Sequence, residues 1–106
     1  MGGGLKMELI LSTKNERVKN WKKLQSKKGR QKAGAYLIEG FHLIEEAIKN
    51  DAVILEMMVS EEIAFENIPT FDEEKQVEIS AEFAKSLSET ETSQGIFAVV
   101  QKKELV

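Results

Sequence analysis

Hydrophobic positions in this chain gather in short runs, and the spacing within and between these runs changes along the sequence. Two continuous apolar runs, at residues 53–59 and 96–100, predict strands covered on both faces, as in the interior of a layered sheet. Residues 35–38 and 76–79 predict two shorter strands. Residues 8–11 form only a short apolar segment ahead of the first helix.

Three segments show helical spacing. Residues 14–25 place Val18 and Trp21 near one face, and residues 41–50 repeat the pattern with polar positions on the opposite side. Ser80 can cap a third helix. Trp21 could stack on a nucleobase, but its spacing with other apolar residues favours a place in the core.

The remaining segments are polar. Residues 26–34 contain two glycines and several lysines, which predicts a mobile basic loop. Residues 60–72 are acidic, include the only proline, and predict a loop with one helical turn at 61–66, while residues 88–94 form a polar connector. Because strands alternate with helices, we expect an α/β layered sandwich with a mixed or largely parallel central sheet flanked by helices.

Length and composition exclude several classes of protein. The chain has 106 residues, enough for one domain, and has no cysteine and one histidine. No apolar run approaches the roughly 20 residues of a membrane-spanning helix. Residues 1–6, with three consecutive glycines, are interpreted as a leader added to a natural start at Met7. The domain is expected to span residues 7–106.

Charge is distributed unevenly. Residues 1–49 carry a net charge of +6 and residues 50–106 carry −9, which together give the total of −3. Nine cations and one anion, Glu16, lie between Thr13 and Lys32. Such a block can neutralise several phosphates, so it favours a polyanionic partner, either nucleic acid or an acidic protein. The alternative is a solvated helix face followed by a flexible loop.

The inventory of reactive groups argues against a self-contained enzyme. None of the glycines lies in a phosphate-binding loop motif, and no residues have metal-ligand spacing. His42 lies in the first turn of the helix predicted at 41–50 and is expected to be structural or solvent-facing. Glu45, Glu46 and the acidic run at 72–74 are expected to be solvated surface residues.

Two segments nevertheless carry a family pattern. Lys-Lys-Gly-Arg begins at Lys27 and is followed by Leu-Ile-Glu-Gly at 37–40, and Ser-Gln-Gly-Ile-Phe-Ala-Val-Val occupies 93–100. Over residues 8–102 the chain resembles the N-terminal substrate-binding domain of SpoU (TrmH-type) RNA 2′-O-ribose methyltransferases. Glu16 and Ser93 depart from the family pattern, which commonly has proline at these positions.

This resemblance implies an L30e-like fold and an RNA partner, rRNA or tRNA, in the cytoplasm and away from membranes. It also implies a parent enzyme whose knotted C-terminal SPOUT domain binds S-adenosylmethionine, forms a homodimer and transfers the methyl group. That domain is absent from this chain. We therefore expect the chain to be a monomer without cofactor, metal or activity of its own.

The expected RNA contacts come from the basic block, because arginine and lysine bind phosphate oxygens. Asn15 is equally well explained as a helix cap, Gly40 is expected to form the turn between strand and helix, and Glu39 could anchor Arg30 instead of touching RNA. The candidate contacts are Lys14, Asn15, Arg17, Lys27, Lys28, Arg30 and Lys32, with Glu39 and Gly40 in support.

Two other functions remain open. One is a free-standing L30e-like, ribosome-associated RNA-binding protein without enzymatic activity. The other is a protein-interaction domain whose basic block meets an acidic partner.

Overall fold

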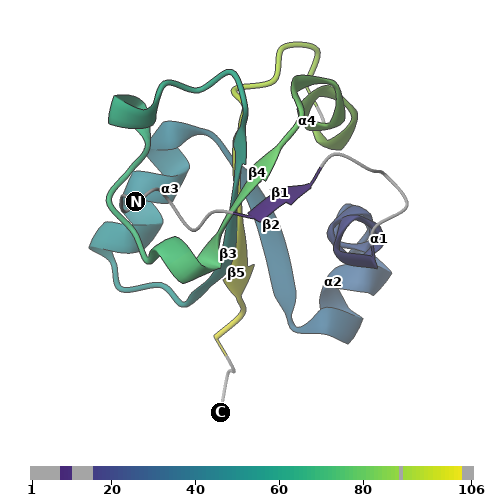
Figure 1. Ribbon diagram of the computed structural model, residues 1–106. Helices are drawn as coiled ribbons and strands as arrows, with labels where there is room; N and C mark the ends of the chain where they lie inside the picture. The colour runs from purple at the N-terminus through teal and green to yellow at the C-terminus, as the bar shows by residue number, and fades with distance from the viewer. Residues whose placement is uncertain (1–7, 11–15, 89, 104–106) are drawn as a thin grey trace.

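The computed structural model describes residues 8–10, 16–88 and 90–103, which form one five-stranded sheet with helices on both faces (Figure 1). The strands are β1 (Glu8–Ile10), β2 (Ala35–Glu39), β3 (Ile54–Ser60), β4 (Gln76–Ile79) and β5 (Ile96–Gln101). The helices are α1 (Glu16–Lys23), α2 (Lys27–Ala33), α3 (Phe41–Lys49) and α4 (Ala81–Leu87), with short 3-10 turns at Phe65–Asn67 and Glu73–Lys75.

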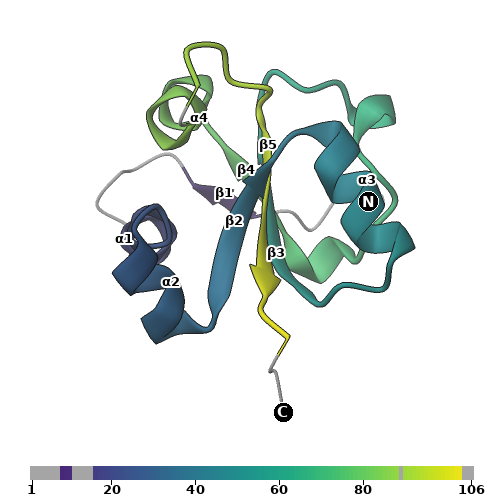
Figure 2. The ribbon, with the colours of Figure 1, turned by 180° about the vertical axis from the view of Figure 1, so that it is seen from behind.

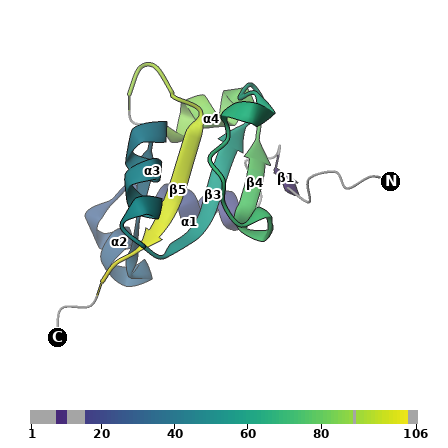
Figure 3. The same ribbon diagram turned by 90° about the vertical axis from the view of Figure 1, so that its left-hand side faces the viewer.

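The sheet is mixed, and its strand order is β1-β4-β3-β5-β2. Strands β1, β4 and β3 run parallel, whereas β5 is antiparallel to both of its neighbours, β3 and β2. Figure 3 shows β5, β3, β4 and β1 side by side in this order. The predicted α/β sandwich is confirmed, and β3 and β5 are interior strands as their apolar runs predicted. The short apolar segment before α1 adds a fifth strand, β1, that its pattern alone did not predict.

Two hydrophobic cores lie on opposite faces of the sheet. Helices α1 and α4 cover one face and α3 covers the other (Figures 1 and 2). Successive side chains of β5 point to opposite faces of the sheet and so belong to both cores. Phe97 and Val99 lie in the core under α1 and α4, and Ile96, Ala98 and Val100 lie in the core under α3. This explains why the run at 96–100 is apolar throughout: neither face of β5 meets water.

The prediction of a mobile loop at 26–34 is wrong, because this segment contains helix α2. The hydroxyl of Ser26 accepts a hydrogen bond from the N–H of Gly29 (3.0 Å) and caps the helix, and Gly34 ends it in the left-handed conformation at φ 66°. A Cβ built on Gly29 would lie 1.8 Å from the carbonyl oxygen of Lys23. Gly29 therefore serves close packing of α2 on the end of α1, where the sequence suggested flexibility.

Two smaller expectations also need correction. The strand predicted at 53–59 includes Val53, but Val53 precedes β3 and is 51% exposed. The helical turn expected at 61–66 lies slightly later, as the 3-10 turn Phe65–Asn67. Ser80 caps α4 as predicted, accepting a hydrogen bond from the N–H of Phe83 at 3.0 Å.

Candidate nucleic-acid interface

After Glu16, the first residue of α1, the charged residues of helices α1 and α2 are all cations. Residues 17–34 hold eight lysines and arginines and no aspartate or glutamate. The two helices follow each other directly and lie together beside β2 (Figure 2). We call this surface the α1–α2 basic face. Its exposed cations are Lys19, Lys22, Lys23, Lys27, Lys28 and Lys32.

The predicted contact residues are placed unequally on this face. Lys27, Lys28 and Lys32 are exposed on α2. Arg30 is half-buried, and its Nη1 donates a hydrogen bond to the carbonyl oxygen of Leu24 (3.1 Å), so part of its guanidinium ties α2 to the end of α1. Lys14 and Asn15, and with them the possible helix cap at Asn15, lie outside the described residues.

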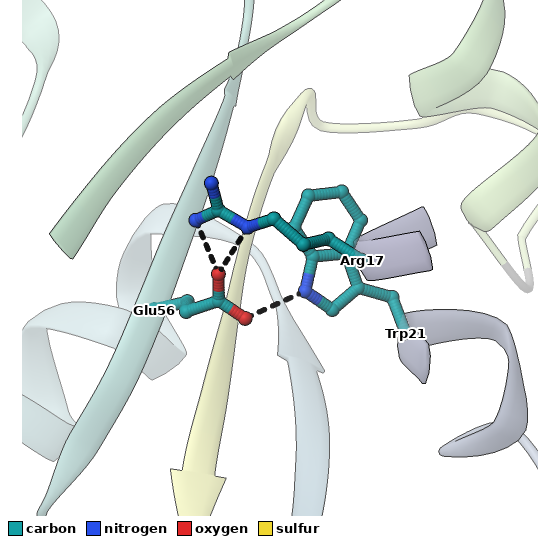
Figure 4. Close-up of polar contacts among 3 residues, drawn as sticks. All are labelled: Arg17, Trp21 and Glu56. Atoms are coloured by element: carbon teal, nitrogen blue, oxygen red, sulfur yellow. Dashed lines mark hydrogen bonds and ion pairs between the residues drawn. The ribbon is translucent and has the colours of Figure 1, made fainter. Parts of the chain in front are cut away.

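Arg17 is engaged with Glu56 of strand β3 (Figure 4). Its Nε donates a hydrogen bond to Glu56 Oε2 at 3.0 Å, and its Nη2 contacts the same oxygen. The other carboxylate oxygen of Glu56 accepts a hydrogen bond from Nε1 of Trp21 at 2.9 Å. The Arg17 guanidinium also lies 5.9 Å from the centre of the Trp21 ring. One carboxylate thus holds two residues of α1 against the sheet.

Trp21 has the core position that its spacing favoured. Its side chain is 1% exposed, and its ring stacks on Phe83 of α4 with centroids 5.9 Å apart. A ring so deeply buried is not available to stack on a nucleobase. Its N–H still needs a partner, which Glu56 supplies.

Glu56 lies within the run predicted to form a strand covered on both faces, and no role was predicted for it. Strict alternation in β3 would place it on the same face as Ile54. The register shows why Glu56 and Ile54 do not share a face. Ile54 pairs with Val100 and Glu56 pairs with Val99, which leaves Leu55 as an extra residue between them. This β-bulge turns the carboxylate toward α1. A lone glutamate within an apolar strand was the only available signal.

Glu39 and Gly40 serve the fold next to the basic face. The carboxylate of Glu39 accepts hydrogen bonds from the hydroxyl of Ser88 (2.8 and 3.0 Å) and from the N–H of Gln94 (2.9 Å). Glu39 therefore holds the connector between α4 and β5. The contact suggested between Glu39 and Arg30 is replaced by the hydrogen bond from Arg30 to the Leu24 carbonyl oxygen. Gly40 begins α3 at φ 114°, and a Cβ there would lie 2.8 Å from the Gln94 side chain, so the predicted turn is confirmed.

The opposite face of the molecule carries negative charge. Helix α3 and the segment 61–75 cover the α3 side of the sheet (Figure 1), and many of their acidic side chains are exposed. They are Glu45, Glu46, Glu61, Glu62, Glu66, Asp72 and Glu74. Such a separation of signs orients a polyanion toward the α1–α2 basic face before contact.

Other chemistry finds little support in the part of the chain that the structure describes. Within it, no group of three or more histidine, cysteine, aspartate or glutamate residues could hold a metal ion. None of its helices is long and apolar enough to cross a membrane. His42 is exposed on α3, as expected of a solvent-facing residue.

Comparison with known proteins identifies the domain. Residues 15–98 match the family described as the MRM3-like substrate binding domain. The chain belongs to this family. The matched range includes α1, α2, α3, α4, β2, β3, β4 and the first part of β5, and so covers the segment that carries the basic face.

Its relatives are RNA methyltransferases by name. The 23S rRNA (guanosine(2553)-2'-O)-methyltransferase RlmP of Bacillus subtilis is 42% identical over 101 residues, which cover 92% of this chain and 39% of that protein. A crystal structure of an RNA 2'-O ribose methyltransferase superposes with a TM-score of 0.74 at 26% identity, covering 92% of this chain and 39% of the other.

An AdoMet-bound rRNA methyltransferase from Sinorhizobium meliloti shares the fold, with a TM-score of 0.76 at 16% identity over 92% of this chain and 37% of that one. The chain therefore spans about two-fifths of the length of these relatives. It corresponds to their substrate-binding part.

Proposed function

We propose that this chain is the RNA-binding part of an S-adenosylmethionine-dependent RNA 2′-O-ribose methyltransferase and that RNA binds on the α1–α2 basic face. The observation that carries the proposal is the set of six exposed lysines on two consecutive helices, without an acidic residue between positions 17 and 34. Lysines on such a surface neutralise phosphates and release their counterions, which supplies affinity without reading sequence.

The name of the curated relative supports rRNA as the ligand, and tRNA is the alternative that the family resemblance implies. In the parent protein the chain would hold folded RNA so that one ribose hydroxyl reaches a catalytic part outside this chain. S-adenosylmethionine would bind to that catalytic part, as the resemblance to SpoU methyltransferases implies. A homodimeric parent, a monomeric isolated domain, an L30e-like fold and a cytoplasmic location belong to the same proposal.

The proposed contacts are the exposed lysines of α2, with Arg30 beside them. Arg17 has a different role in this proposal: because its guanidinium pairs with Glu56, it fixes α1 and so positions the lysines of that helix. Lys14 and Asn15 remain proposed contacts that lie outside the described residues.

The test is a salt series of filter-binding measurements on a structured ribosomal RNA fragment. Reversing two exposed charges, Lys27→Glu and Lys28→Glu, should weaken binding and flatten the slope of log K against log salt by about 1.5, since each lost phosphate contact removes roughly 0.7–0.9. The control is Lys49→Glu with Lys75→Glu, which changes the net charge equally at exposed positions outside the basic face. Equal effects of the two pairs would refute the proposed location.

A further inference from the structure

A groove of about 370 Å³ lies where α1 and α2 meet strands β3 and β5. Its polar lining comes from Asn20, Lys23, Lys32 and Glu56, and its apolar lining includes Trp21, Leu55 and Val99. This volume is at the lower end of the roughly 300–1,000 Å³ of ligand sites in proteins. Two exposed lysines of the α1–α2 basic face, Lys23 and Lys32, line the groove.

The bulge in β3 explains why the groove has an apolar wall. Leu55 is the extra residue between Ile54 and Glu56, so no residue of β5 lies opposite it, and its side chain is 42% exposed. A single exposed leucine is ordinary on a protein surface. Here the leucine shares the lining of a hollow with Asn20, Lys23 and Lys32, an arrangement that combines apolar and cationic residues at one place. The carboxylate of Glu56, also in the lining, is paired with Arg17.

We propose that this groove receives one unstacked nucleotide of the RNA that binds on the α1–α2 basic face. The inference rests on the proposed function and adds to it what kind of RNA element is preferred. The base would contact Leu55 and Val99 through its apolar face. The carboxamide of Asn20 offers both a donor and an acceptor to a base edge, and the ammonium groups of Lys23 and Lys32 attract the adjoining phosphates.

Regular double-stranded RNA does not fit this chemistry, because its bases are stacked and its major groove is too narrow for side chains to read. Bulges and loops can extrude a base into a protein groove. An aromatic platform is the usual partner of such a base. Trp21 is in the lining of the groove, but its side chain is only 1% exposed and is hydrogen-bonded to Glu56. The contact proposed here is therefore aliphatic.

The test compares two RNA hairpins with the same stem and loop, one fully paired and one with a single 2-aminopurine inserted in the stem as an unpaired bulge. The wild-type chain should bind the bulged hairpin about fivefold more tightly or better. Leu55→Ser should bring this ratio close to 1 without changing the affinity for the paired hairpin. The 2-aminopurine fluorescence should change on binding to the wild type and much less with L55S.

The matched control is Leu43→Ser, which alters another exposed leucine, 51% exposed on α3 and away from the groove. L43S should keep the wild-type ratio. The Lys27→Glu, Lys28→Glu pair should weaken binding of both hairpins equally and leave the ratio unchanged. Because Leu55 is exposed, L55S should fold, and this is checked from the urea midpoint.

The possible failures are distinguishable. If the wild type binds both hairpins with the same affinity, or if L55S keeps the preference, the nucleotide groove is refuted while RNA binding on the basic face stands. If neither hairpin binds at low salt, the proposed function fails as well.

Discussion

Glu56 is the residue whose replacement most directly tests how the basic face is attached to the sheet. Its carboxylate accepts a hydrogen bond from the Trp21 indole and pairs with Arg17, so it connects β3 to both residues of α1. The side chain of Trp21 is 1% exposed, and in Glu56→Ala its indole N–H loses its acceptor. A buried donor left without a partner costs about 1–3 kcal/mol.

The ion pair contributes less. The side chains of Arg17 and Glu56 are 33% and 26% exposed, and partly solvated pairs are worth about 0.2–1 kcal/mol. Glu56→Ala should therefore lower the free energy of unfolding by about 1–4 kcal/mol in all. For a domain of this size each kcal/mol shifts the melting temperature by roughly 4–8 °C. Glu56→Gln keeps an oxygen acceptor for Trp21 and should cost less than about 1 kcal/mol.

Urea unfolding followed by fluorescence measures both variants, because Trp21 is the only tryptophan in the chain. Glu45→Ala removes a glutamate that is exposed on α3, and it should change stability by less than about 0.5 kcal/mol. Equal losses for Glu56→Ala and Glu56→Gln would refute the reasoning, since charge rather than the Trp21 hydrogen bond would then dominate.

Two further substitutions test the backbone around the helices. Gly29→Ala should destabilise the protein by about 1–3 kcal/mol because its Cβ would clash with the Lys23 carbonyl, although alanine gains about 1 kcal/mol in helix propensity. Urea unfolding measures the change, with Gln31→Ala at an exposed position of the same helix as the control. A stabilised G29A would contradict the packing described. Asp51→Gly should raise the melting temperature, because Asp51 has φ 57° and glycine removes roughly 1 kcal/mol of left-handed strain. Asn50→Gly is the control: Asn50 has φ −94°, so glycine there should lower the melting temperature.

Local spacing and composition were enough to predict the layers of this protein and the place of its positive charge. The apolar runs at 53–59 and 96–100 required strands covered on both sides, and Val18 and Trp21 defined the buried face of α1, because removing apolar surface from water is the main driving force for folding such segments. The concentration of cations between Thr13 and Lys32 needs no fold to be seen. The family pattern in the same segment identified the substrate-binding domain.

Which groups on that charged segment are available, and how they are presented, depends on long-range packing. Gly29 looked like a loop residue because glycine has low helix propensity, yet α2 forms since only glycine allows its close approach to Lys23. The pairing of β3 with β5 introduced a bulge that turned Glu56 toward Trp21 and exposed Leu55 at the groove. Strand register and helix contacts join residues far apart in the sequence, and local spacing cannot specify these long-range contacts.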